Sequence, residues 1–253
     1  MKLTILGEPD TDWADALAAR FRAAGHTVVA GDLGADHRPS DAQLADSLAT
    51  SDAAIDVCCV DGRIKGAALA LVDAHLPADR PLWSCCLASA ATYVAASVHT
   101  PERVFGFSLL PPWDARTTVE CCRALQSTER YVDLATAVWS AAALEPVWVG
   151  DGTGLVLGRI VACLANEAAF TVAEGTASPA DVDAAMRLGT RYPRGPLAWA
   201  NAIGPRVVVA VLDALAAEHG EDRYRAAPWL RRHAVAGRPL PLEAAAGPQE
   251  EAP

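Results

Sequence analysis

The sequence predicts an α/β domain over residues 1–152 and an all-α domain over residues 153–240. In the first part, apolar segments typical of buried strands alternate with segments of helical periodicity, which indicates a doubly wound parallel sheet. After Gly154 no strand pattern remains, and long helical segments follow. Residues 241–253 are predicted to be a disordered tail because they combine Gly, Pro and Glu with few large apolar residues.

The α/β domain opens with a strand, a helix and a second strand. KLTILG at 2–7 is an apolar run that ends in Gly, and WADALAARFRAAG at 13–25 has apolar residues at helical spacing before a terminating Gly. HTVVAGD at 26–32 is a second strand, which completes a βαβ unit. The later predicted strands are 53–61, 80–89 with its turn, 103–110 and 145–150, and the later predicted helices are 65–76 and 129–144.

The helical domain has clear start and stop signals. LVLGRIVACLANEAAFTVAEG runs to Gly175, and Ser178-Pro179-Ala180-Asp181 then supplies a cap, a proline for the first turn and an acidic residue three positions after the cap. The next helix is expected to stop at Gly189, and a final long helix ends at Gly220.

Composition excludes several classes of protein. With 52% hydrophobic and 21% charged residues over 253 positions, the chain has enough apolar surface for a core. A net charge of −10 argues against nucleic-acid binding, which needs a basic surface. No segment approaches the ~18 uninterrupted apolar residues of a membrane span, and MKLTILGEP lacks the pattern of a signal peptide. We therefore expect a cytoplasmic protein with no membrane partner.

The cysteines and histidines do not predict a metal site. Six of the seven cysteines form the adjacent pairs Cys58-Cys59, Cys85-Cys86 and Cys121-Cys122. Neighbouring residues on a strand point to opposite faces, so neither member of a pair can easily share a metal with the other. We expect buried thiols in a reducing compartment, with a thiol nucleophile at Cys85 or Cys86 as the alternative. No two of the six histidines have metal-ligand spacing.

The helical half resembles the C-terminal domain of 3-hydroxyacyl-CoA dehydrogenases over residues 154–237. The matching features are Asn166-Glu167, the SPADVDAAM helix start, the turn at 192–196 and the pair Ile203-Gly204. The first half resembles the NAD domain of this family more weakly, through AGHTVVAGD, IDVCCVDGRIKGAAL and TPERVFGF followed by TTVECCRALQS. The resemblance implies an α/β Rossmann-like N-terminal domain, an all-α C-terminal domain and NAD as the cofactor.

The cofactor loop departs from the family pattern. Family members carry GxGxxG after the first strand, whereas this chain has Gly7-Glu8-Pro9-Asp10-Thr11-Asp12. We expect Asp10 or Asp12 to cap the next helix and to repel a pyrophosphate. Among the positions that match cofactor-binding residues, the chain retains Gly7, Asp32 at the ribose-reading position and Lys65 at a cofactor-side lysine.

The catalytic positions also depart from the pattern. The Gly-x-His-Phe-Phe-Asn-Pro run of the family aligns with residues 106–112, which places Ser108 at the position of the general base. A serine cannot accept the hydroxyl proton unaided. Glu120 matches the glutamate that orients the histidine of the family, and its alternative interpretation is a solvated carboxylate at a helix start. The substrate-binding serine and asparagine of the family align with Leu87 and Gly158.

Three functions remain open on this sequence. The first is a 3-hydroxyacyl-CoA dehydrogenase-like protein of acyl-CoA and fatty-acid metabolism that is catalytically impaired or non-catalytic. The second is an active, divergent NAD-dependent 3-hydroxyacyl-CoA oxidoreductase that uses Glu120. The third is a module that binds acyl-CoA, a smaller ligand or a partner subunit. Under each, we expect a homodimer through the helical domain, whose VVVAVLDAL segment is apolar on more than one face.

Overall fold

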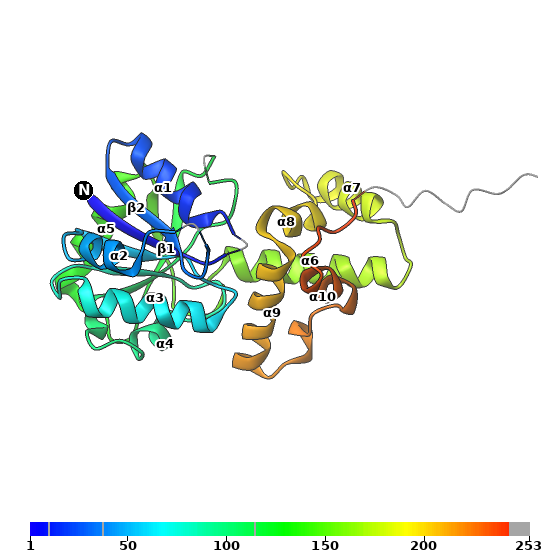
Figure 1. Cartoon of the computed structure of the whole chain (residues 1–253). Coiled ribbons are helices and arrows are strands. Elements are labelled where there is room, and N and C mark those ends of the chain that lie inside the picture. Colours follow the sequence, from blue (N-terminus) through cyan, green and yellow to red (C-terminus); the bar gives the residue numbers. More distant parts are fainter. Residues whose placement is uncertain (10, 37, 114, 243–253) are drawn as a thin grey trace, which may run out of the picture. The chain divides into compact units, whose positions relative to one another are not determined.

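The structure, a computed structural model, describes residues 1–9, 11–36, 38–113 and 115–242. It divides into two compact units, Met1–Arg159 and a second that begins at Ile160 (Figure 1). The predicted tail lies outside the described residues from position 243 onward. The two units are a sheet with flanking helices and a group of helices, which confirms the predicted fold class.

The first unit contains a seven-stranded sheet with the order β2-β1-β3-β4-β5-β6-β7. The strands are β1 Lys2–Gly7, β2 Thr27–Asp32, β3 Ala53–Asp56, β4 Leu82–Cys85, β5 Val104–Ser108, β6 Thr118–Arg123 and β7 Glu145–Trp148. Strands β1 to β5 are parallel, but β6 is antiparallel to β5 and parallel to β7. The prediction of an all-parallel sheet was therefore wrong for the last two strands. The described residues between β5 and β6 form no helix, and the segment is too short for a parallel crossover.

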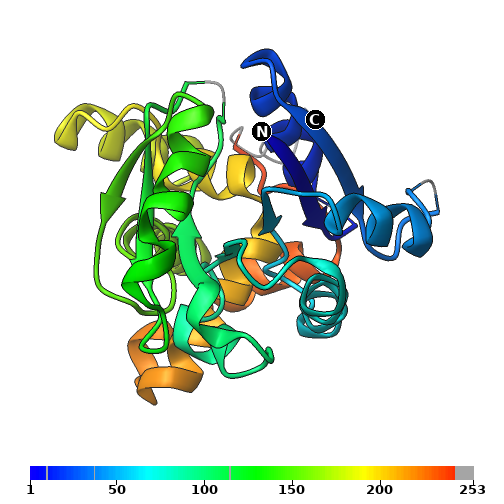
Figure 2. The ribbon, with the colours of Figure 1, turned by 90° about the vertical axis from the view of Figure 1, so that its left-hand side faces the viewer.

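Helices cover both faces of this sheet (Figure 2). They are α1 Trp13–Ala23, α2 Asp41–Leu48, α3 Gly62–His75, α4 Ala91–Ala95 and α5 Val132–Ala141, with 3-10 turns at Pro101–Arg103 and Glu129–Tyr131. Apolar residues of α2, α3 and α4 form one core with Leu6, Ala54 and Leu82 of the strands. On the other face, Phe21 of α1 and Trp83 of β4 both contact Trp139 of α5. Because neighbouring strand residues alternate between faces, Leu82 and Trp83 belong to different cores.

The described residues of the second unit form helices and connecting turns, with no strand. It comprises most of α6 Leu157–Ala173, followed by α7 Pro179–Thr190, α8 Pro196–Ile203, α9 Pro205–His219, a 3-10 turn at Asp222–Tyr224 and α10 Pro228–Val235. Ser178 caps α7 by accepting a hydrogen bond from the N–H of Asp181, as predicted. The helix continues past the expected stop at Gly189, because Arg191 rather than the glycine takes the left-handed conformation that ends it.

The long helix α9 is covered within the chain itself. Because this helix is apolar on more than one face, the sequence predicted that it would pack against a second subunit. The structure instead buries most of them in the single chain, namely Val207, Val208, Val209, Val211, Leu212 and Leu215. Within the described residues, no helix alone could cross a membrane by length and composition; α8 and α9 pass such a test only as a pair, bent by 99° at their junction.

Candidate functional site

The sheet order places its switch point between β1 and β3, because the chain leaves β1 for β2 on one side and returns to β3 on the other. Ligands of open α/β sheets bind at the carboxyl ends of the strands at such a point. Here Glu8 follows β1, and Cys59, Val60 and Asp61 lie between β3 and α3. These two loops therefore form the first part of the candidate site.

The carboxylate of Glu8 occupies this position. Its Oε1 accepts hydrogen bonds of 2.8 Å from the backbone N–H groups of Cys59 and Val60, and its Oε2 accepts one of 2.9 Å from Asp61. Consecutive N–H groups of this kind form a concavity that binds anions. Glu8 is only 1% exposed, so the carboxylate of the chain itself fills the concavity.

Glu8 is not the residue that the sequence singled out. We expected Asp10 or Asp12 to act as the internal anion, but Asp10 lies outside the described residues. Asp12 is at the N-cap position of α1, yet its side chain accepts no capping hydrogen bond. Glu8, in the same loop, had no predicted role. Its burial could not be foreseen because its partners are backbone groups 51 to 53 positions away.

Gly7 and Asp32 lie side by side at the ends of β1 and β2. A Cβ atom at residue 7 would be only 2.1 Å from Oδ1 of Asp32, which explains why glycine is needed there. This Oδ1 is buried and has no hydrogen-bond partner among the described residues. Burial, together with the carboxylates of Asp15, Glu8 and Asp12, raises the pKa of Asp32 to about 6.

Lys65 lies inside a buried polar network. Its Nζ contacts Oδ2 of Asp56 at 2.6 Å and Oγ of Ser84 at 2.8 Å, and it also donates to the carbonyl groups of Cys58 and Cys85. Burial favours the neutral amine, but the charge and hydrogen bond of Asp56, together with the neighbouring Cys85 and Cys58, outweigh that effect and raise the pKa of Lys65 above its usual value. The predicted cofactor-side lysine thus joins β3, β4 and α3 through groups of the chain itself.

A cavity of about 440 Å³ lies beside the end of β2, lined in part by Leu33, Gly34 and Ile64. Two arginines also line it, and both are paired with aspartates: Arg38 with Asp41 at 2.7 Å and Arg63 with Asp61 at 3.3 Å. The cavity is large enough for a small organic ligand, but its cationic groups already have anionic partners.

Ser108 and Glu120 are opposite each other in the antiparallel pair β5–β6. Ser108 is 3% exposed, and its hydroxyl has no hydrogen-bond partner among the described residues. Glu120 accepts backbone hydrogen bonds from Val156 and Leu157, at 3.2 and 3.0 Å. Burial raises the pKa of Glu120, and these hydrogen bonds partly oppose the shift. Glu120 is on a strand, so its alternative interpretation as a residue at a helix start was wrong.

Leu87 and Gly158 compensate for each other. A Cβ atom at residue 158 would lie 2.4 Å from Cδ2 of Leu87 and 3.6 Å from Oγ of Ser108. The side chain of Leu87 is fully buried, and it fills the space that any side chain at residue 158 would need. The two positions that align with polar substrate-binding residues of the family therefore hold an apolar side chain and a glycine that makes room for it.

The cysteines at the strand ends are buried. Cys85 is 2% exposed and Cys86 is fully buried. Contact with the Cys122 thiol, together with burial, raises the pKa of Cys86. Contact with Cys59 and the charge of Lys65 lower the pKa of Cys85, while burial opposes them. Neither sulfur is exposed to solvent as a nucleophile must be.

Comparisons with known proteins bear on the whole chain. Residues 154–242 match the model of the 3-hydroxyacyl-CoA dehydrogenase C-terminal domain. A probable 3-hydroxybutyryl-CoA dehydrogenase of Bacillus subtilis is 34% identical over 58% of this chain. A 3-hydroxybutyryl-CoA dehydrogenase of Clostridioides difficile is 30% identical over 74% of it. The chain belongs to the 3-hydroxyacyl-CoA dehydrogenase family. These alignments span 51% and 66% of the lengths of the two relatives.

Solved structures of the family share the fold of this chain. A (S)-3-hydroxybutyryl-CoA dehydrogenase of Ralstonia eutropha superposes with a TM-score of 0.74 at 24% identity and covers 93% of both chains. FadB2 of Mycobacterium tuberculosis superposes with a TM-score of 0.81 at 20% identity, over 97% of this chain and 99% of its own. At these identities the likeness establishes the fold, and the site must be judged from its own residues.

Proposed function

We propose that this member of the family does not catalyse oxidation of a 3-hydroxyacyl-CoA and serves acyl-CoA metabolism as a non-catalytic subunit or binding module. The observation that carries the proposal is the environment of Ser108. A buried hydroxyl, which has no hydrogen-bond partner within the described part of the chain, stands where the family pattern has the group that removes the substrate proton. Proton abstraction from an alcohol requires a base with a pKa near the working pH, and an unassisted serine is not such a base.

The loop after β1 supports the same proposal because it does not fit the pyrophosphate of NAD. The carboxylate of Glu8 already accepts the hydrogen bonds of the three backbone N–H groups between β3 and α3 at the switch point. The carboxyl of Asp32 is pushed toward its neutral form by Asp15, Glu8 and Asp12 as well as by burial. A dinucleotide would bring two further negative charges to this place, where Coulomb repulsion opposes them.

The region around Leu87 supports it as well. Leu87 fills the space above Gly158, so a polar group at residue 158 could not approach a substrate carbonyl without displacing the leucine. An oxyanion is stabilised by oriented donors in a polar site, and these two positions offer an alkyl group and a hydrogen atom. Residues 87 and 158 thus offer no polar group to a substrate, and residue 108 offers only a hydroxyl, in one region of the first unit.

A second candidate function rests on Glu120. Burial raises the pKa of its carboxyl, which is the direction expected for a general base, and the side chain is not fully enclosed. An active enzyme would use Glu120 to accept the hydroxyl proton directly. The carboxylate now accepts hydrogen bonds from the backbone N–H groups of Val156 and Leu157. This alternative requires that it give up those hydrogen bonds.

Ligand-dependent stability together with turnover tests the proposal. We expect the melting temperature to be unchanged by NADH, and we expect no oxidation of NADH when acetoacetyl-CoA is present. A ligand at 100 times its Kd would stabilise the fold by about 2.7 kcal/mol, which a melting curve resolves readily. Turnover that disappears in Glu120→Gln while NADH still stabilises the protein would overturn the proposal in favour of the second candidate.

A further inference from the structure

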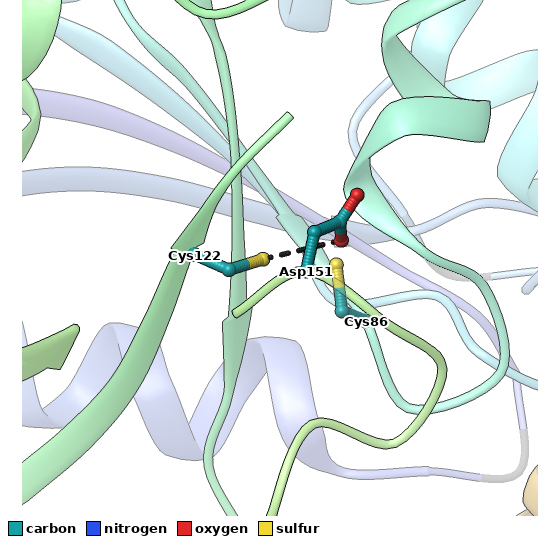
Figure 3. A group of neighbouring side chains, drawn as sticks. All are labelled: Cys86, Cys122 and Asp151. Atoms are coloured by element: carbon teal, nitrogen blue, oxygen red, sulfur yellow. Dashed lines mark hydrogen bonds between the residues drawn. The ribbon is translucent and has the colours of Figure 1, made fainter. Parts of the chain in front are cut away.

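Two thiols and a carboxylate converge where β4, β6 and the segment after β7 meet in the first unit (Figure 3). Sγ of Cys86, Sγ of Cys122 and a carboxylate oxygen of Asp151 all lie within 4.8 Å of one another. Cys122 donates a hydrogen bond of 3.5 Å to Oδ1 of Asp151. Each cysteine comes from a different adjacent pair, so the cluster combines the members that face the same side of the sheet.

Gly106 makes room for this cluster. It lies on β5, between β4 and β6, and is paired with Ser84 on one side and Cys122 on the other. A Cβ atom at residue 106 would lie 2.4 Å from Sγ of Cys86 and 2.5 Å from Sγ of Cys122. Both sulfurs therefore lie over the glycine, in the space that a side chain of β5 would otherwise fill.

A disulfide is not the natural product of this arrangement. Cys86 directly follows β4 and still pairs with β5, because its N–H donates a hydrogen bond to the carbonyl of Phe107. Cys122 is on β6, so β5 separates the backbones of the two cysteines. Two strand spacings put the Cα atoms about 10 Å apart, whereas a disulfide requires about 7 Å or less. The thiols approach each other only through their side chains, a geometry that a bridging ion accommodates.

We propose that Cys86, Cys122 and Asp151 bind a thiophilic divalent cation of the Zn²⁺ class. A tetrahedral zinc ion with bonds of about 2.3 Å to sulfur and 2.0–2.2 Å to oxygen separates its sulfur and oxygen ligands by about 3.5 Å. The Cys122 sulfur and the Asp151 oxygen are 3.5 Å apart. Binding converts both thiols to thiolates and releases two protons to solvent. Because the chain supplies three ligands to a four-coordinate ion, one coordination position remains for water.

Asp151 is held in position for this role. Its Oδ1 accepts a hydrogen bond of 2.8 Å from the N–H of Ala91, and its Oδ2 accepts one of 2.9 Å from Thr92. Such outer bonds orient a carboxylate ligand. The bond to Thr92 is exposed to solvent, whereas both sulfurs are fully buried, so an ion would enter from the side of the carboxylate.

The test uses the full chain, reduced and freed of metal, with Co²⁺ as an optical probe and Zn²⁺ as competitor. We expect one equivalent of Co²⁺ to produce a thiolate-to-metal charge-transfer band, which one equivalent of Zn²⁺ removes. Zn²⁺ should also raise the melting temperature. The matched control is Cys121→Ala, because Cys121 is equally buried on the same strand but faces the other side of the sheet.

The variants determine the outcome. Cys122→Ala should lose the band and the thermal shift, whereas Cys121→Ala should keep both. Asp151→Asn preserves the size of the side chain and both thiols, and it should weaken Zn²⁺ binding at least tenfold if Cys122→Ala proves too unstable to use. Absence of the charge-transfer band in the unaltered chain, or an equal band in Cys122→Ala and Asp151→Asn, would overturn the proposal.

Discussion

At the scale of single residues, Glu8 carries an unusual share of the local structure. It is the acceptor for three consecutive N–H groups between β3 and α3. Glu8→Ala would leave these donors without a partner, and each buried unsatisfied group costs about 1–3 kcal/mol. We expect Glu8→Ala to lower the free energy of unfolding by at least about 3 kcal/mol, as measured by urea denaturation.

Asp12→Ala is the matched control for this prediction. It removes a carboxylate from the same loop, but the Asp12 side chain makes no capping hydrogen bond. We expect a change within about 1 kcal/mol. Equal losses in the two variants would mean that net charge in the loop, and not the hydrogen bonds of Glu8, determines its stability.

Asp32 should make the stability of the chain depend on pH. Its pKa in the folded protein is about 6, above the usual value of 3.8, so folding disfavours the ionised form. The stability associated with the neutral carboxyl is fully present below pH 3.8 and is lost as pH rises through 6. Asp32→Asn removes this titration. We expect the variant to gain roughly 1 kcal/mol over the unaltered chain at pH 7, after allowance for solvent screening.

The measurement compares urea denaturation of both proteins between pH 4 and pH 8. The difference in unfolding free energy should be smallest at the acidic end and should grow toward neutrality. Asp36→Asn, at an exposed position in the same loop, serves as the control. A difference that does not vary with pH would show that Asp32 does not titrate in this range.

At the scale of elements, Leu87 after β4 and Gly158 in α6 should behave as one unit. Gly158→Ala would place a methyl group 2.4 Å from Leu87, so we expect a loss of about 1–3 kcal/mol despite the better helix propensity of alanine. With Leu87→Ala present, the same change should cost little. The double-mutant cycle should therefore give a coupling energy of about 1–3 kcal/mol.

Gly66→Ala in α3 provides the comparison, because a Cβ atom there meets nothing within 4 Å. This substitution should leave stability unchanged or raise it by up to about 1 kcal/mol. A coupling energy of zero would mean that α6 shifts freely away from Leu87. It would then contradict the interpretation that Leu87 and Gly158 compensate for each other.

Sequence periodicity predicted most of these elements correctly. Apolar runs located β1 to β5 and β7, and the Ser178-Pro179 signal located the start of α7. Strand β6 was not among the predicted strands. Its antiparallel direction depends on the connection from β5, and hydrophobic pattern carries no information on strand orientation. Helix α2 was not among the predicted helices, because its sequence is short and polar, although Ser40 and Gln43 form a capping box.

The candidate site was less predictable than the fold. Resemblance to the family located Ser108, Glu120, Leu87 and Gly158. That Leu87 fills the space over Gly158 depends on tertiary packing, which a sequence alignment does not give. The cluster of Cys86, Cys122 and Asp151 depends on residues from three separate segments. Adjacent cysteines point to opposite faces of the sheet, as expected. The sequence gives no means of finding which cysteines of different pairs point toward each other.

At the scale of the whole molecule, the two units differ in how much of the family pattern they keep. The helical unit matches the family model over nearly its full length and retains structural contacts such as that of Asn166, which bonds to the backbone of Arg225 and Ala227. The α/β unit keeps the fold of the solved relatives, but the family model matches the chain only from residue 154 onward. Under the proposed non-catalytic function, the helical unit would carry the assembly of the protein.

The oligomeric state tests that interpretation, and we predict a homodimer formed through the helical unit. Since α9 is buried within the chain, the exposed apolar side chains of other helices must supply the contact: Leu188 of α7 is 76% exposed and Val235 of α10 is 85% exposed. Such residues bury apolar area on association. Light scattering at micromolar concentration should give the mass of two chains, and Leu188→Glu or Val235→Glu should shift it toward one. Leu125→Glu, at a position 89% exposed in the other unit, should leave the dimer intact. A monomer in the unaltered chain, or equal dissociation by Leu125→Glu, would contradict an interface in the helical unit.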